Sequence, residues 1–154
     1  IEIATEKHTD ELRELTNLIN EHLISPPVFL KRNGGKLNDQ EIKDMFLSDN
    51  IISMVAMKND RIISCIRGQM NQGNIPIIDE KGTFGIDFGF TRKEYRRKKI
   101  AAMVLHELVT VAINNGAKLC SVDFETQNIE GRNFWLTYFS PIVYSMMRKI
   151  DDRI

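Results

Sequence analysis

Four consecutive basic residues, Arg96 to Lys99, form the segment of this sequence best suited to chemistry. They follow a run with the alternation of a strand and precede a run with the spacing of a helix. The first N–H groups of a helix lack partners within it and lie at the positive end of its dipole, so basic side chains there strengthen an anion site. The segment therefore predicts a site for a diphosphate, as carried by a nucleotide-like cofactor.

A solvated basic turn is the alternative interpretation of these four residues, because runs of like charge usually face water. The whole chain has 21 basic and 21 acidic residues and a formal net charge of zero. This balance argues against nucleic acid or an acidic membrane surface as the main partner. The longest apolar runs, such as residues 51–57, are also far shorter than the roughly 20 residues that cross a bilayer. We therefore expect no nucleic acid and no membrane partner.

The chain length of 154 residues predicts a single domain over residues 1–154. Cys65 and Cys120 lie in apolar, strand-like runs, where a free thiol usually packs as a small core side chain. We therefore expect reduced thiols and a cytoplasmic protein. The three histidines are scattered, without a second ligand at metal-binding spacing, so we expect no metal site.

The first half of the chain predicts two helices followed by two strands. Thr9 is expected to cap the first helix, which the Pro26-Pro27 pair ends. Residues 38–41 have the pattern of a capping box at the start of the second helix. Strands over residues 51–57 and 61–70 are then expected to form a hairpin.

A third strand is predicted over residues 83–91, with a strict alternation of large and small side chains. The alternation predicts two faces, with Phe84, Ile86, Phe88 and Phe90 on the packed face and Gly85, Asp87 and Gly89 on the bare one. Glycines on a bare strand face mark a bulge, a close approach by a ligand, or simple packing beside a turn.

Helix and strand signals alternate through the rest of the chain. A helix starting at Ile100 is expected to end at Gly116, followed by a strand over 119–124, a helix over 129–139 and a last strand over 142–149. The complete order is β-α-α-β-β-β-α-β-α-β. This order predicts an α/β (mixed α+β) fold in which helices cover both faces of a mixed sheet.

The pattern Arg96-x-x-Lys99-x-Ala101 resembles the Arg/Gln-x-x-Gly-x-Gly/Ala acyl-coenzyme A loop of the GNAT N-acetyltransferase superfamily. The predicted order of elements is also that of the family, whose sheet is twisted and mostly antiparallel, and the loop falls in the family's position. Lys99 stands where the family has glycine. Its side chain either obstructs the diphosphate or points outward from an ordinary helical φ and adds a charged contact.

A second resemblance lies in residues 128–135, which are similar to the family's Asn-x-x-Ala-x-x-Leu/Phe-Tyr segment, with Gly131 for alanine and Trp135 for tyrosine. The family implies acetyl-CoA as cofactor, with Asn128 hydrogen-bonded to the pantetheine arm. The implied cofactor-binding residues are Phe90, Thr91, Arg96, Arg97, Lys98, Lys99, Ile100, Ala101, Ala102 and Asn128.

The resemblance implies acetyl transfer from acetyl-CoA to a primary amine of a small molecule or peptide, by direct attack. Asp87, on the bare strand face, is the candidate base, and a structural hydrogen bond is its alternative role. Because indole cannot protonate a thiolate, Tyr138 is the candidate acid in place of Trp135, with Tyr144 as a weaker one. The alternative function is a degenerate domain that binds acyl-CoA or a protein partner without turnover. A homodimer is compatible with either function.

Overall fold

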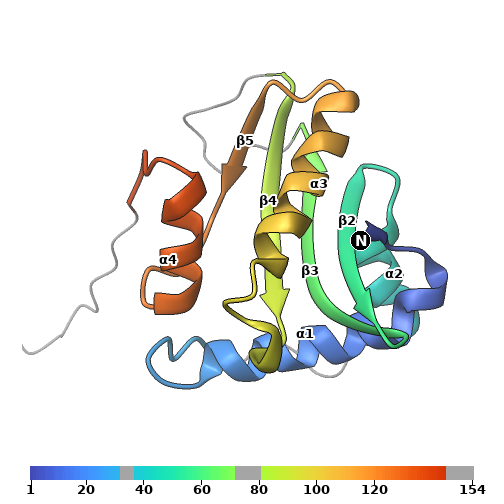
Figure 1. Ribbon diagram of the computed structural model, residues 1–154, viewed down its shortest axis with the longest axis vertical. Helices are drawn as coiled ribbons and strands as arrows, with labels where there is room; N and C mark the ends of the chain where they lie inside the picture. The colour runs from blue at the N-terminus through green and yellow to red at the C-terminus, as the bar shows by residue number, and fades with distance from the viewer. Residues whose placement is uncertain (32–36, 72–80, 145–154) are drawn as a thin grey trace, which may run out of the picture.

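Five strands form one mixed sheet in the computed structural model, which describes residues 1–31, 37–71 and 81–144 (Figure 1). Their order in the sheet is β1-β2-β3-β4-β5, antiparallel throughout except for the parallel pair β4 and β5. The strands are β1 (Glu2–Ile3), β2 (Ile51–Lys58), β3 (Arg61–Met70), β4 (Thr83–Thr91) and β5 (Leu119–Val122). The predicted mixed, mostly antiparallel fold class is confirmed.

The helices cover both faces of this sheet, and α4 lies beside β5 (Figure 1). The described helices are α1 (Thr9–Ile24), α2 (Asp39–Leu47), α3 (Ile100–Asn114) and α4 (Ile129–Tyr138), with single 3-10 turns η1 (Glu6–His8) and η2 (Lys93–Tyr95). None of the helices in the described ranges is long and apolar enough to cross a membrane.

The sheet separates two apolar cores. Ile86 of β4, Val104 and Leu108 pack between the sheet and α3, and all three are fully buried. Leu15 and Phe46 pack on the opposite face, below α1 and α2. Burying a side chain of this size contributes roughly 1.5–3 kcal/mol. The stripe on α3 therefore holds the start of that helix next to the end of β4.

A β-bulge interrupts β4, and it contradicts the predicted single apolar face. Arg67 of β3 pairs with Phe88 and Gly68 pairs with Ile86, so Asp87 is an extra residue between them. The apolar side chains consequently divide, Phe84 and Ile86 toward α3, Phe88 and Phe90 toward α1 and α2. Strand alternation cannot reveal such an inserted residue, because the sequence on either side still alternates.

The start of α1 also differs from the prediction, since Thr9 is the first helical residue and does not cap the helix. The chain already turns at η1, where the Thr5 N–H donates to Nδ1 of His8 at 2.9 Å. The Thr9 hydroxyl donates to the Glu6 carbonyl at 2.8 Å. Helix α1 thus follows directly on η1, with His8 in the N-cap position and no side chain capping the helix.

Other local predictions are confirmed. Glu41 N–H donates to Oδ1 of Asn38 at 3.0 Å and Asn38 N–H donates to the Glu41 carboxylate at 2.7 Å, which is the capping box of α2. Asn59 and Asp60 have φ of 50° and 58°, as a tight hairpin between β2 and β3 requires.

The order of elements agrees with the prediction from β1 to α4. The expected final strand over 142–149 falls mostly on residues 145–149, which lie outside the described residues. Its first three residues, 142–144, are irregular.

Candidate active site

The segment between β4 and α3 contains two residues in the left-handed region. Arg97 has a φ of 59° and Lys99, the residue that caps α3, has a φ of 62°. The first hydrogen bond of the helix runs from Met103 N–H to the Lys99 carbonyl, at 3.0 Å. The N–H groups of residues 100–102 therefore have no partner within the helix and are available to an anion.

The left-handed backbone at Lys99 corrects one of the two expectations for this residue. An ordinary helical φ is absent, and Lys99 instead has the conformation that glycine adopts without cost. For a residue with a Cβ, this conformation costs roughly 1–2 kcal/mol. The chain therefore keeps the backbone of a glycine-type turn while adding a basic side chain to it.

A cavity of about 480 Å³, here called the loop cavity, lies between this turn, the end of β4 and α4. Its lining includes nine of the predicted cofactor-binding residues, Phe90, Thr91, Arg96, Arg97, Lys99, Ile100, Ala101, Ala102 and Asn128. Lys98 does not line it, and its ammonium lies 5.5 Å from the centroid of the Tyr95 ring. The basic turn is thus part of a concave site, rather than a convex patch of charge.

Arg96 contacts residues on two sides of this cavity. Its Nε donates to the Thr91 carbonyl at 3.0 Å, and its guanidinium lies 5.7 Å from the centroid of the Phe90 ring. The same guanidinium forms an ion pair with Glu130, in the first turn of α4. Arg96 therefore ties the end of β4 to α4, across the loop cavity.

Asn128 begins α4 and contacts a residue that the sequence did not single out. Its Oδ1 accepts a hydrogen bond from Gly131 N–H at 3.2 Å and lies 3.3 Å from Nε2 of His22. His22, in the last turn of α1, also lines the loop cavity. The two residues are 106 positions apart, so no local pattern could have found this contact. The Asn128 side chain therefore connects the start of α4 with the end of α1.

A second cavity, of about 610 Å³, opens where β4 and β5 separate, and we call it the gap cavity. The pairing of these strands ends at Ile86 and Val122, so the following residues of β4 have an edge that no described strand pairs. Gly89, Asn128 and Trp135 line both cavities. The two cavities therefore share part of their walls beside β4.

Asp87, the residue inserted by the bulge, lines the gap cavity. Both of its carboxylate oxygens accept hydrogen bonds from Arg67, at 2.8 and 2.7 Å. The Arg67 guanidinium lies over the Phe46 ring, 5.1 Å from its centroid, and only 11% of its side chain is exposed. The structural hydrogen bond considered for Asp87 is therefore present, and it ties the carboxylate to Arg67 of β3.

Trp135 and Tyr138 occupy different environments on α4. The Trp135 side chain is buried at 7% exposure and lines both cavities. Tyr138 is 51% exposed, lines only the loop cavity, and its ring lies 5.2 Å from that of Phe134. Of the described aromatic residues with a hydroxyl, Tyr95 and Tyr138 line this cavity.

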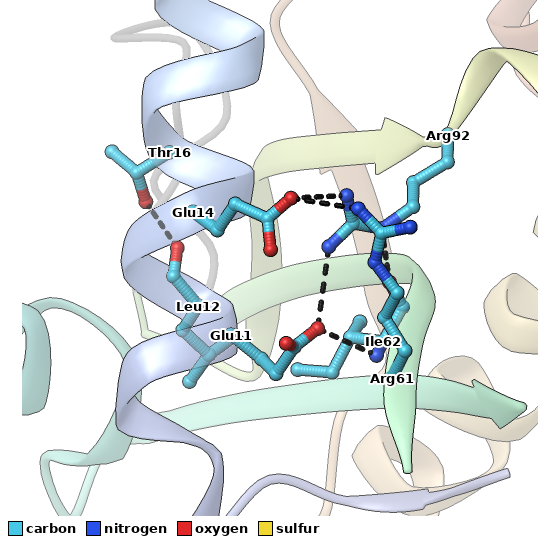
Figure 2. A network of polar contacts seen from close by, with 7 residues as sticks. All are labelled: Glu11, Leu12, Glu14, Thr16, Arg61, Ile62 and Arg92. Carbon is cyan, nitrogen blue, oxygen red and sulfur yellow. Dashed lines mark hydrogen bonds and ion pairs between the residues drawn. The ribbon is translucent and has the colours of Figure 1, made fainter. Parts of the chain in front are cut away.

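Arg92, next to the end of β4, is the buried centre of an ion-pair network that holds α1 against the sheet (Figure 2). Its guanidinium contacts Glu14 at 2.6 Å and Glu11 at 3.2 Å, and its side chain is 3% exposed. Glu11 also accepts a hydrogen bond from Ile62 N–H at 3.0 Å, and Arg61 reaches Glu14 at 2.9 Å. The hydrogen bond from Arg92 lowers the pKa of Glu14 to about 2. Arg92 is therefore a structural residue, although it lies beside the basic turn in the sequence.

Neither cysteine is suited to nucleophilic chemistry. Burial raises the pKa of the Cys65 thiol to about 12 and that of Cys120 to about 11. Both thiols are free, as the sequence predicts. Because the thiolate is the reactive form, a covalent cysteine mechanism is disfavoured.

Comparisons with known proteins agree with this geometry. The sequence pattern described as the acetyltransferase (GNAT) family matches residues 13–138. Among solved structures, a mutant BH1408 protein from Bacillus halodurans superposes with a TM-score of 0.80 at 12% identity, over 97% of each chain. The aminoglycoside N-acetyltransferase AAC(6')-Iy in complex with CoA has a TM-score of 0.73 at 11% identity, over 97% of this chain and 98% of that one. The aminoglycoside acetyltransferase meta-AAC0020, from an uncultured soil metagenomic sample, has a TM-score of 0.72 at 11% identity, over 97% and 95%. Among curated proteins, none matches the sequence.

Proposed function

This chain belongs to the GNAT family of acetyl-CoA-dependent acetyltransferases, and we propose that it moves an acetyl group to a primary amine by direct attack. The observation that carries the proposal is that two cavities share walls at Gly89 and Trp135. The loop cavity suits an anionic acyl donor, because it contains the basic turn and the start of α3. The gap cavity then receives the amine. The aminoglycoside acetyltransferases of the same fold make a small-molecule acceptor a reasonable expectation.

The residues of the loop cavity fit acetyl-CoA in two parts. The N–H groups of residues 100–102, with Arg97 and Lys99, would hold the diphosphate, since charge-assisted bonds to a helix start are strong. The unpaired edge of β4 at residues 90–91 and the amide of Asn128 would hold the pantetheine arm, as an added strand holds to a sheet edge. Bound there, acetyl-CoA supplies the thioester carbonyl and a thiolate leaving group.

The protein's own contribution is to hold the amine, remove its proton and exclude water. The attacking amine must be neutral, so we assign Asp87 to take the ammonium proton through a water molecule. The amine nitrogen would then form a bond to the thioester carbonyl carbon as the carbon–sulfur bond breaks, and the nitrogen would lose its second proton to solvent. A thiol with a pKa near 8.5 leaves without strict need for an acid. Tyr138, on the loop cavity, gives the thiolate a proton that solvent replaces.

Calorimetric titration with acetyl-CoA, together with a free-thiol assay over a panel of amines, tests the proposal. Binding should also raise the melting temperature, because a ligand specific for the native state stabilises it by about 2.7 kcal/mol at a hundredfold excess over Kd. If millimolar acetyl-CoA gives neither heat nor a melting shift, the proposal fails.

A non-catalytic acyl-CoA-binding domain is the second candidate. Two observations favour it, the strained Lys99 where the family has glycine and the indole of Trp135 where many members have a phenol. This candidate would be supported over the enzyme if acetyl-CoA binds tightly but releases no free thiol with any amine of the panel.

A further inference from the structure

We infer that His22, in the last turn of α1, is a positioning residue for the acyl donor. It fixes the Asn128 amide so that Nδ2 is the group that bonds to a carbonyl of the pantetheine arm. The inference rests on the proposed function, because it concerns the cavity in which acetyl-CoA would bind. The role of Asn128 comes from the family resemblance, whereas that of His22 comes from the contact between the two side chains. Both residues line the loop cavity.

The backbone of Gly131 decides which atom of the Asn128 amide is the oxygen. An N–H group can only donate, so the atom that faces Gly131 N–H at 3.2 Å must be Oδ1. The same Oδ1 lies 3.3 Å from Nε2 of His22. Nε2 therefore carries a proton and donates it, as it does in the imidazolium and in one of the two neutral forms of the ring.

These two bonds leave the amide nitrogen of Asn128 for a ligand. Within the described part of the chain, Nδ2 has no acceptor, and its two N–H groups match the carbonyl oxygens of the pantetheine amides. The bond to Gly131 alone leaves the plane of the amide free to turn, because the terminal torsion of asparagine is broad. The bond from His22 fixes that plane, and with it the direction in which Nδ2 donates.

Gly131 makes room for this conformation of Asn128. A Cβ atom at position 131 would be 2.9 Å from Nδ2 and 3.2 Å from Cγ of Asn128. An alanine, which the family has at this position, would therefore have to push the amide out of its present place. The departure from the family pattern at Gly131 is thus explained by the conformation that brings Asn128 to His22.

The end of α1 is held to the start of α4 at a second point, so His22 acts from a fixed position. With its amide nitrogen as the donor, Gln127 bonds to the Pro27 and Val28 carbonyls at 3.0 and 3.2 Å. Val28 is buried, at 5% exposure. Ile19, one turn before His22, also lines the loop cavity. The end of α1 is therefore a wall of the site for the acyl donor.

Two matched ligands separate a positioning role from a general structural one. Acetyl-CoA contains the pantetheine arm, and adenosine 3′-phosphate 5′-diphosphate is its nucleotide half without that arm. His22→Leu should raise the calorimetric Kd for acetyl-CoA by about fivefold, the size expected for one hydrogen bond. Its Kd for the nucleotide half should not change, because the diphosphate would bind at the basic turn. A distortion of the whole cavity would weaken the binding of both ligands.

Two further variants serve as the conservative replacement and the control. His22→Gln should retain most of the affinity for acetyl-CoA, because the glutamine amide nitrogen can donate from about the place of Nε2. His106→Leu should have no effect, because His106 is exposed on α3 and lines neither cavity. In an acetylation assay, His22→Leu should raise KM for acetyl-CoA and leave kcat nearly unchanged, since the bond to the arm is the same before and during the reaction.

A double-mutant cycle tests whether His22 acts through Asn128. Asn128→Ser removes the amide but keeps an oxygen that can cap α4. In this background, His22→Leu should cause no further rise in the Kd for acetyl-CoA. Urea denaturation of each variant measures any loss of stability separately from the loss of binding.

Three results would overturn the inference while leaving the proposed function intact. They are a wild-type Kd for acetyl-CoA in His22→Leu, an equal loss of affinity for both ligands, and a loss that persists beside Asn128→Ser. If the wild-type protein does not bind acetyl-CoA at all, the proposed function is refuted and the inference is refuted with it.

Discussion

The indole ring of Trp135 lies directly against the backbone of Gly89, so that a Cβ atom at position 89 would be 2.9 Å from Cζ2 of the ring. Both residues line the loop cavity and the gap cavity, so this contact forms part of the wall that the two cavities share. Of the roles considered for a glycine on this strand, Gly89 has that of packing, in its case against a ring of the chain itself. Any side chain at position 89 has to move the indole.

Gly89→Ala is accordingly expected to destabilise the protein, because an added methyl group in a packed site costs about 1–3 kcal/mol. Urea denaturation measures the change in the free energy of unfolding. The double variant with Trp135→Phe should recover much of the loss, since the smaller ring leaves room for the methyl group. An equal loss in the presence of Phe at position 135 would contradict this account.

Lys99→Gly is expected to stabilise the protein by about 0.5–1 kcal/mol, despite the usual cost of glycine. The gain is the left-handed strain removed, roughly 1–2 kcal/mol, less the extra freedom that glycine gives the unfolded chain. Lys98→Gly is the matched control, because Lys98 is not among the residues with positive φ, and it should destabilise. Chemical denaturation of both variants separates the relief of strain from the added freedom of the unfolded chain. A loss of stability in Lys99→Gly would contradict the claim that Lys99 is strained.

Charge reversal at Arg97 should weaken acetyl-CoA binding far more than reversal at Lys93. Arg97 lines the loop cavity, whereas Lys93 is exposed in η2 and does not line it. Arg92 is unsuitable as a comparison, because its guanidinium is buried against two carboxylates and its reversal would disrupt the fold. The test compares calorimetric Kd values for acetyl-CoA near physiological salt, because electrostatic attraction beyond about 8 Å is screened under that condition. Equal losses at positions 93 and 97 would indicate a diffuse electrostatic effect.

Glu14 makes the protein lose stability in acid. Its pKa falls from 4.5 in the unfolded chain to about 2 in the folded one, first because of the hydrogen bond from Arg92. The folded state therefore binds the proton less readily, so the contribution of Glu14 is complete above about pH 5 and disappears as the pH falls toward 2. Because the Glu14 side chain is 42% exposed, solvent screening reduces this contribution to roughly 1 kcal/mol.

Glu14→Gln should therefore reduce the free energy of unfolding at pH 7 and flatten its decline between pH 5 and 2. Glu21→Gln is the matched control on the same helix, and it should follow the wild-type pH dependence. Parallel curves for wild type and Glu14→Gln would exclude the Glu14–Arg92 pair as the source.

Local signals predicted much of this fold. The capping box at Asn38 and the order of elements through α4 follow from residue types a few positions apart. The position of the basic turn, between β4 and α3, could be predicted from the sequence in the same way. Each of these features depends on backbone preferences and hydrophobic periodicity, which the sequence expresses directly.

Features that depend on pairing between distant segments could not be predicted from the sequence. The bulge at Asp87 exists because β3 and β4 pair with unequal lengths, and neither strand alone displays it. The contact between His22 and Asn128 and the burial of Arg92 against α1 join segments that only the assembled fold brings together. The sequence therefore does not distinguish a buried basic residue such as Arg92 from the solvated basic residues near it.

Asp87→Asn should lower kcat/KM for the acetylated amine by about 10² to 10⁴, because removing a general base leaves the ammonium to lose its proton unaided. Raising the pH should restore part of the rate, since more of the amine is then already neutral. The Kd for acetyl-CoA should barely change, because Asp87 lines the gap cavity and not the loop cavity.

The ion pair with Arg67 requires a further measurement, because Asp87→Asn also leaves a nearly buried guanidinium without its charge partner. Urea denaturation of the variant measures separately the loss in free energy of unfolding. Unlike the rate, this loss should not depend on the amine and should not be reversed at high pH. Tyr138→Phe should reduce kcat/KM less than Asp87→Asn, since the thiolate departs without a proton, and its pH profile should keep the wild-type shape. An Asp87→Asn enzyme with wild-type kinetics across the pH range would remove Asp87 from the proton transfer and leave it the role of pairing with Arg67.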